Sequence, residues 1–211
     1  MFNDIPLIAV VSASALLPFL IASGTCYVKF SIVFIMIRNA LGLQQVPSNM
    51  TLNGVALLIS MFVMMPVTTA MYDDYSNRTG EIRNARDMAA AIEEVSGPYR
   101  TYLEKYSDPA LVRFFARTET GSDGVAGDAV QPSIFALLPA YALSEIKSAF
   151  TIGFYLYLPF VVVDLVISSI LLSLGMMMMS PVTISVPVKL ILFVAMDGWR
   201  LLAEGLIRQY M

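Results

Sequence analysis

The sequence predicts an all-α protein of membrane-targeted helical hairpins with kinked helices and a small helical insert outside the membrane. Hydrophobic residues make up 57% of the 211 residues and charged residues only 14%, whereas soluble domains carry about 25% charged residues. Apolar stretches long enough to cross about 30 Å of hydrocarbon as helices lie on both sides of a charged segment. These observations predict three parts: residues 1–72, 73–131 and 132–211.

Residues 1–72 are predicted to form an apolar helical hairpin. Ile5–Val28 contains no charge, and apolar character resumes after Lys29. A second apolar helix is predicted over Thr51–Met71. The turn between the arms is marked by Gly42, Pro47 and Asn49. Prolines expected to kink or break these helices are Pro18 and Pro66.

Residues 73–131 are interpreted as a small helical subdomain with a solvated charged face, because they hold 18 of the 29 charges. Apolar residues recur every three or four positions over Ile82–Val95, which predicts an amphipathic helix that ends at Gly97-Pro98. Asp108-Pro109 is predicted to start a short helix. The side chains expected to be buried there are Leu111, Phe114 and Phe115. Gly121 to Gly127 is expected to be flexible.

Residues 132–211 are predicted to form the second apolar hairpin. Leu137–Leu158 is predicted to be helical, Pro159 to break that helix, and Phe160–Leu174 to continue as a further helix. Between Pro181 and Pro187 apolar and polar residues alternate, which predicts a short extended segment. Val188–Tyr210 is predicted to be one amphipathic helix.

The charges within and beside the apolar segments are predicted to be buried structural charges. A charge near the centre of a bilayer costs about 2.5–3.5 kcal/mol or more, so these groups should face one another, a water-filled cavity or a partner chain. The candidates are Lys29, Glu145, Lys147, Asp164, Lys189 and Asp197. Asp164 is expected to pair with Lys147 or Lys189, although a place in a conduit wall or an ion path remains open.

Four consecutive methionines, Met176, Met177, Met178 and Met179, precede Ser180-Pro181. Successive helical residues point about 100° apart, so these side chains cannot all face one core. Thioether side chains are flexible and polarisable and can close around irregular shapes. The run is therefore either apolar filler at the end of a helix or a functional constriction.

The composition argues against several classes of protein. Without histidine, and with no second intramembrane aspartate or phosphate-binding glycine loop, the sequence contains no recognisable enzyme site and predicts no cofactor or metal. The single Cys26 is interpreted as an inert buried thiol. A net charge of −3 without a basic stripe indicates no nucleic-acid partner. The N-terminus lacks the basic region of a secretory signal, so the first hydrophobic segment is expected to remain.

The sequence resembles the FliP/SctR/SpaP family of export-gate subunits from type III secretion systems. The resemblance covers about residues 1–72 and 132–211. It is carried by an ordered series of motifs: Lys29–Phe34, Arg38–Gly42 with Pro47, Pro139–Phe150, Gly153-Phe154, Pro159–Leu165, Gly175–Pro181 and Phe193–Trp199. Flagellar relatives typically carry a cleavable signal peptide, and its expected absence here favours the injectisome branch.

The resemblance implies assembly into a helical ring, a homo-pentamer that joins two small companion subunits in an inner-membrane export gate. The large export-gate switch subunit and the basal-body rings are the further implied partners, and unfolded secreted proteins are the cargo. Such gates stand largely at the periplasmic side, above the membrane plane. Met176, Met177 and Met178, with Met179 adjoining, would form a gasket that seals the pore.

Two other functions remain open from the residues. In a small-solute or ion transporter, Asp164 and Lys147 would serve as coupling charges, although no inverted repeat is evident. In a purely structural membrane scaffold, the methionine run would tolerate polar substitution. The positive-inside rule places the first turn in the cytoplasm and the charged insert outside.

Overall fold

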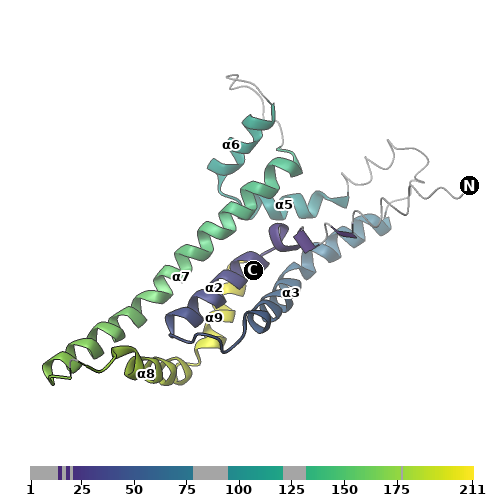
Figure 1. Ribbon diagram of the computed structural model, residues 1–211. Helices are drawn as coiled ribbons and strands as arrows, with labels where there is room; N and C mark the ends of the chain where they lie inside the picture. The colour runs from purple at the N-terminus through teal and green to yellow at the C-terminus, as the bar shows by residue number, and fades with distance from the viewer. Residues whose placement is uncertain (1–13, 16–17, 20, 78–94, 121–131, 177) are drawn as a thin grey trace, which may run out of the picture. The chain divides into compact units, whose positions relative to one another are not determined.

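The computed structural model describes residues 14–15, 18–19, 21–77, 95–120, 132–176 and 178–211, and all regular structure in these ranges is helical. The all-α prediction is therefore confirmed. The chain forms two compact units, residues 1–28 with 64–146 and residues 29–63 with 147–211, which are described separately. Each unit combines residues from more than one of the three parts predicted from the sequence. The division into those three parts stays a prediction. Figure 1 labels the helices α2 Tyr27–Ala40, α3 Asn49–Asn77, α5 Gly97–Tyr106, α6 Pro109–Thr120, α7 Ile134–Ser173, α8 Pro181–Ala195 and α9 Gly198–Ile207.

The predicted turn between the first two apolar helices is present and is closed by hydrogen bonds. α2 ends in a Schellman motif, in which Leu43 N donates to Arg38 O at 3.2 Å and Gly42 N to Asn39 O at 3.0 Å. Gly42 has φ +78°, a left-handed conformation that favours glycine. α3 then runs unbroken from Asn49 to Asn77 with Pro66 inside it. The helix predicted over Thr51–Met71 is thus confirmed and is longer at both ends.

α7 corrects the prediction that Pro159 breaks the helix. It is a single helix of 40 residues, Ile134–Ser173, which passes through both Pro139 and Pro159 (Figure 1). A proline inside a helix removes one backbone hydrogen bond and costs about 3 kcal/mol. The intact hydrogen-bond ladders on both sides hold the helix together, as in many apolar helices.

The predicted extended segment between Pro181 and Pro187 is wrong, because these residues open helix α8. Ser180 has extended backbone angles and Pro181 occupies a first helical position, where its fixed φ favours a helix start. The side chains that α8 buries are Ser185, Lys189 and Phe193. This four-residue spacing has the period of a helix, and the short alternation concealed it.

The last predicted helix, Val188–Tyr210, is broken rather than continuous. α8 ends at Ala195, α9 begins at Gly198, and the two are bent by 61°. Asp197 adopts left-handed angles, φ 52° and ψ 46°, which aspartate tolerates better than most residues. A side chain at Gly198 would overlap the ring of Phe193, so glycine permits this close packing. The predicted polar face of one long helix is therefore divided between two.

The insert is helical where it is described, with one correction. Gly97-Pro98 begins α5, because proline fits the first turn of a helix, and the end of a preceding helix at this point stays a prediction. α6 starts at Pro109 as predicted, and Asp108 Oδ1 accepts a hydrogen bond from Ala110 N at 3.0 Å. Phe114, expected to be buried, is exposed, and Leu111 and Phe115 are partly exposed. Residues 82–94 of the predicted amphipathic helix and the segment 121–127 lie outside the described residues.

α3 and α7 are each long and apolar enough to cross a membrane. The bent pair α8 and α9 adds a third candidate span if it is counted as one. By length and composition, two or three spans within the described part of the chain are thus suited to a membrane.

Candidate functional site

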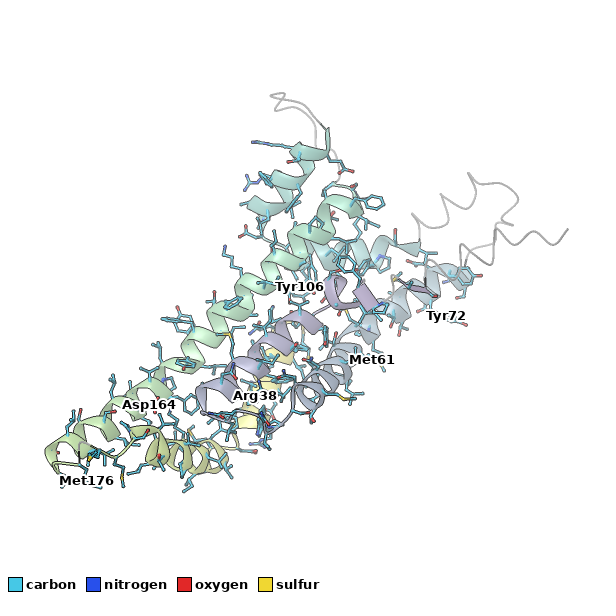
Figure 2. The ribbon with its side chains drawn as sticks, viewed as in Figure 1. Arg38, Met61, Tyr72, Tyr106, Asp164 and Met176 are labelled. Atoms are coloured by element: carbon cyan, nitrogen blue, oxygen red, sulfur yellow. The ribbon has the colours of Figure 1, made fainter. Side chains whose placement is uncertain are left out.

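The methionine run begins where α7 ends, in a backbone motif that fixes its first residue. Met176 N donates to Leu171 O at 3.0 Å and Gly175 N donates to Leu172 O at 3.1 Å. Gly175 has φ +74°, so these bonds form a second Schellman motif. Figure 2 shows Met176 at this end of α7, beyond Asp164. The chain therefore leaves the helix in a direction set by its own hydrogen bonds.

The described methionines of this run present their side chains to the outside of the chain. Met178 is fully exposed, and Met176 and Met179 are also exposed. Met179 N donates to Met176 O at 3.3 Å, which closes a tight turn before α8 begins at Pro181. Met177 lies outside the described residues. A short loop of exposed thioether side chains, bounded by two helix ends, is thus the most distinctive surface of its unit. We call residues 175–180 the Met loop.

Lys189 connects the helices α2, α7 and α8. Its Nζ donates to Asp164 Oδ2 at 2.6 Å and to Ala40 O, at the end of α2, at 3.2 Å. Lys189 is buried, whereas Asp164 is half-exposed. The predicted pairing of Asp164 with a lysine is confirmed, and the partner is Lys189 rather than Lys147. A cation near the last carbonyls of a helix is favourable, so Lys189 stabilises the end of α2 as well.

A close backbone approach also positions α8. A Cβ atom at Gly42 would overlap Cγ2 of Val186. α8 therefore packs directly against the turn that follows α2, and Lys189 lies one turn further along the same helix. Together these contacts fix the beginning of α8, and so the second end of the Met loop.

Lys29 and a chain of aromatic rings tie α2 to the C-terminal helices. Lys29 is buried, with its Nζ 3.5 Å from Gln209 Oε1 and 4.6 Å from the centre of the Tyr210 ring. The aromatic contacts join Phe34 to Trp199, Trp199 to Phe193 and Phe193 to Phe160, with ring centres 6.2, 5.3 and 6.4 Å apart. These contacts join α2 to α7, α8 and α9 within the unit that carries the Met loop.

The remaining predicted structural charges differ in burial. Glu145 is almost completely buried. Lys147 and Asp197 are exposed, and Asp197 pairs with Arg200 at 2.8 Å. On its own the chain leaves both side chains open, because Lys147 lies on an outer face of α7 and Asp197 lies in the bend between α8 and α9. Their burial against a partner chain stays a prediction.

Arg38 is a buried cation that the sequence-based site set omitted. One of its terminal nitrogens, Nη1, donates to Asn49 Oδ1 at 2.6 Å and to Pro47 O at 3.2 Å. Arg38, labelled in Figure 2, thus bonds two residues of the α2–α3 turn. Its place in the last turn of an apolar helix was the available signal, because a cation there can bond the free carbonyls of the turn. In the described residues, no group of three His, Cys, Asp or Glu side chains could hold a metal ion.

Comparison with known proteins identifies the family. The model of the FliP family matches residues 10–206. The chain belongs to the FliP family. It is 62% identical to the surface presentation of antigens protein SpaP of Salmonella typhimurium, over 100% of this chain and 98% of the relative. It is 43% identical to the Yop proteins translocation protein R of Yersinia pestis, over 99% of this chain and 97% of the relative. The harpin secretion protein HrcR of Erwinia amylovora is 34% identical, over 100% and 98%.

Membership of the FliP family confirms the identification made from the motifs. This FliP-family chain is a structural component of a protein-export apparatus and not an enzyme. The features to explain are therefore surfaces, packing and openings, and not a reaction centre.

Proposed function

We propose that this chain is a core subunit of the export gate of a type III secretion system of the injectisome branch. Several copies, expected to be five, form the pore through which unfolded proteins leave the cytoplasm. The observation that carries this proposal is the Met loop, where exposed methionine side chains stand on a backbone capped at the end of α7. Relatives named for Yop translocation and harpin secretion support secreted proteins as the cargo.

The exposed apolar surface supports assembly with other chains. Of the side chains on α8, only one stripe is buried, while large apolar residues on its other faces are open. They include Val182, Val188, Ile191 and Val194. Patches of this kind mark protein or lipid contacts. The expected partners are further copies of the chain, two small companion subunits, the large switch subunit and the basal-body rings, in an inner-membrane gate largely at the periplasmic side.

The proposed seal works by size and hydrophobicity. Apolar side chains around a narrow axis exclude water and ions because the constriction does not stay wet. Methionine has flexible torsions and a polarisable sulfur, so the same ring can widen around a passing polypeptide. Met176, Met177, Met178 and Met179 are the residues assigned to this seal.

The alternative of a small-solute transporter has less support. It needs Asp164 and Lys147 as coupling charges, but Asp164 already bonds Lys189 at 2.6 Å and Lys147 lies exposed. An ion pair that also caps the end of α2 is better suited to holding helices together than to carrying an ion.

The experiment replaces Met176, Met177 and Met178 together by alanine. Cells with the assembled variant are expected to leak small ions or metabolites and still to secrete a native substrate, because volume is lost at every copy of the seal. Replacement by a bulky aromatic residue should slow secretion instead. A matched control replaces three exposed methionines of α3: Met50, Met61 and Met65. A triple-alanine gate that assembles fully and stays as tight as the wild type would contradict the proposal.

A further inference from the structure

The helical path before α2 is interrupted at Thr25-Cys26, and hydroxyl groups satisfy the carbonyls around this interruption. Ser23 Oγ donates to Phe19 O at 2.7 Å, and Thr25 Oγ1 donates to Ile21 O at 2.6 Å. Each of these two hydrogen bonds joins residues four apart, so it lies within the segment before α2 and would move together with it. Thr25 Oγ1 also accepts a bond from Tyr27 N at 3.3 Å, which helps α2 to start.

A third hydroxyl comes from a distant part of the chain. Tyr99, on helix α5 of the insert, donates its hydroxyl to Gly24 O at 2.8 Å across a sequence separation of 75 residues. The approach is so close that a Cβ atom at residue 24 would overlap the Tyr99 hydroxyl and touch Leu138 Cδ2 at 3.4 Å. Glycine at position 24 is therefore what allows Tyr99 to reach the backbone.

Tyr99 is itself held in place by a group of stacked tyrosines. Its ring is nearly parallel to that of Tyr102, with centres 6.4 Å apart. The Tyr102 hydroxyl lies 2.6 Å from the hydroxyl of Tyr141, on α7, and both rings are buried. Tyr106, labelled in Figure 2, also packs against Tyr102, with ring centres 5.1 Å apart. The donor is thus presented by a rigid support.

The Tyr99 hydroxyl stays protonated and can therefore always donate its hydrogen bond. Burial raises the pKa of Tyr99 to about 12, so its hydroxyl keeps its proton at neutral pH. Cys26 lies at the interruption itself and is completely buried. Cys26 is also the single cysteine of the chain. The single thiol of the chain therefore lies where chemical labelling can detect a movement of the contact between Tyr99 and Gly24.

We propose that Tyr99 is a positioning residue, a latch that holds the insert helix α5 onto the interruption at Thr25-Cys26 and keeps Cys26 covered. The insert then acts on the first apolar segment through this bond and is more than a solvated loop. When the latch opens, the Gly24 carbonyl loses its donor and Cys26 becomes accessible to solvent. The inference concerns this contact alone and does not depend on the Met loop or on the export function.

The test measures how fast a small maleimide labels Cys26 in the full-length protein in membranes, with the total thiol measured after denaturation. Tyr99→Phe removes only the hydroxyl and keeps the ring. One hydrogen bond is worth about 1 kcal/mol net, so labelling through local opening is expected to be about fivefold faster. Tyr72→Phe, the same change at an exposed tyrosine of α3, is the matched control and should label at the wild-type rate.

A second variant separates the latch from a general loss of stability. Gly24→Ala forces the Tyr99 hydroxyl away and should also speed labelling. In Gly24→Ala with Tyr99→Phe, the overlapping hydroxyl is absent, so labelling should be no faster than in Gly24→Ala alone, because both changes act on one contact. Three results would each overturn the proposal. They are labelling of Tyr99→Phe at the wild-type rate, a rate in the double variant that multiplies the increases of the two single variants, and no labelling of Cys26 in any variant.

Discussion

The ion pair between Lys189 and Asp164 is asymmetric. Its two atoms lie 2.6 Å apart, but the lysine side chain is 6% exposed and the aspartate side chain 42% exposed. Lys189 has therefore lost most of its contact with water, while Asp164 keeps much of its own. Removing Asp164 and removing Lys189 should therefore lower the stability by different amounts, since only the buried charge of Lys189 depends fully on its partner.

The first prediction concerns Asp164→Asn, which leaves the buried Lys189 without a counter-charge. We expect a loss of about 1–3 kcal/mol in stability, below the 3–5 kcal/mol typical of fully buried pairs. Thermal unfolding of the purified protein and the yield of assembled complex measure it. The matched control is Asp197→Asn, in an exposed pair with Arg200, which should cost less than about 1 kcal/mol.

The order of these effects is itself a test. The double variant Asp164→Asn with Lys189→Met removes the buried charge as well and should be more stable than Asp164→Asn alone. If the exposed Asp197 pair proved as costly as the Asp164 pair, burial would not be what gives the latter its importance.

The second prediction compares the two glycines that have positive φ among the described residues. A Cβ atom added at Gly175 would meet open space, whereas one added at Gly42 would overlap Val186. A left-handed alanine costs about 1–2 kcal/mol in backbone strain. Gly175→Ala should therefore cost about that amount, and Gly42→Ala more, because the clash at Val186 adds to the strain. Gly42→Ala combined with Val186→Ala should recover the difference, as denaturation of the purified variants would show.

The third prediction concerns Arg38, whose guanidinium group bonds both Pro47 O and Asn49 Oδ1 inside the α2–α3 turn. Arg38→Lys keeps the charge but cannot match this planar geometry. Arg38→Lys should therefore destabilise the protein by about 1–2 kcal/mol, and Arg38→Ala by more, because both part-buried hydrogen bonds of the turn are lost. Protease sensitivity at the turn measures the effect. Equal resistance of Arg38→Ala and the wild type would exclude this role.

The fourth prediction is a decline in stability at alkaline pH. Burial raises the pKa of Tyr99 from 10.0 to about 12, so the folded chain holds this proton more tightly than the unfolded chain. The stabilisation is complete below pH 10 and is lost as the pH rises towards 12. Burial raises the pKa of Tyr102 as well, so it contributes to the same decline. Stability measured from pH 9 to 12 should therefore fall less steeply in Tyr99→Phe, and an unchanged slope would contradict the assignment.

Local signals predicted the helices well where the residues had one dominant conformational preference. Gly42 and Pro47 fit only a turn, and Asp108-Pro109 fits a helix start, so both were identified correctly. Prolines within apolar segments were harder to interpret. Pro159 and Pro187 both lie inside helices, because the cost of one lost hydrogen bond is outweighed by the rest of a long helix.

The site was only partly predictable, because the sequence shows which groups need partners and not where those partners lie. The sequence indicated that Asp164 requires a cation, but the choice of Lys189 over Lys147 depends on how α8 packs on α7. The contact of Tyr99 with Gly24 joins residues far apart in the chain and has no local signature. The left-handed Asp197 that bends the last helix was likewise not evident from composition.

The capped ends of the Met loop set the timescale on which the proposed seal would respond. The bonds of Met176 N to Leu171 O and of Met179 N to Met176 O hold the backbone of the described loop. Opening then requires only rotation of side-chain torsions, which exposed residues complete in picoseconds to nanoseconds. Collective movements of helices take microseconds to milliseconds. A seal of this kind would follow the contour of a moving polypeptide residue by residue and close behind it without waiting for the helices to rearrange.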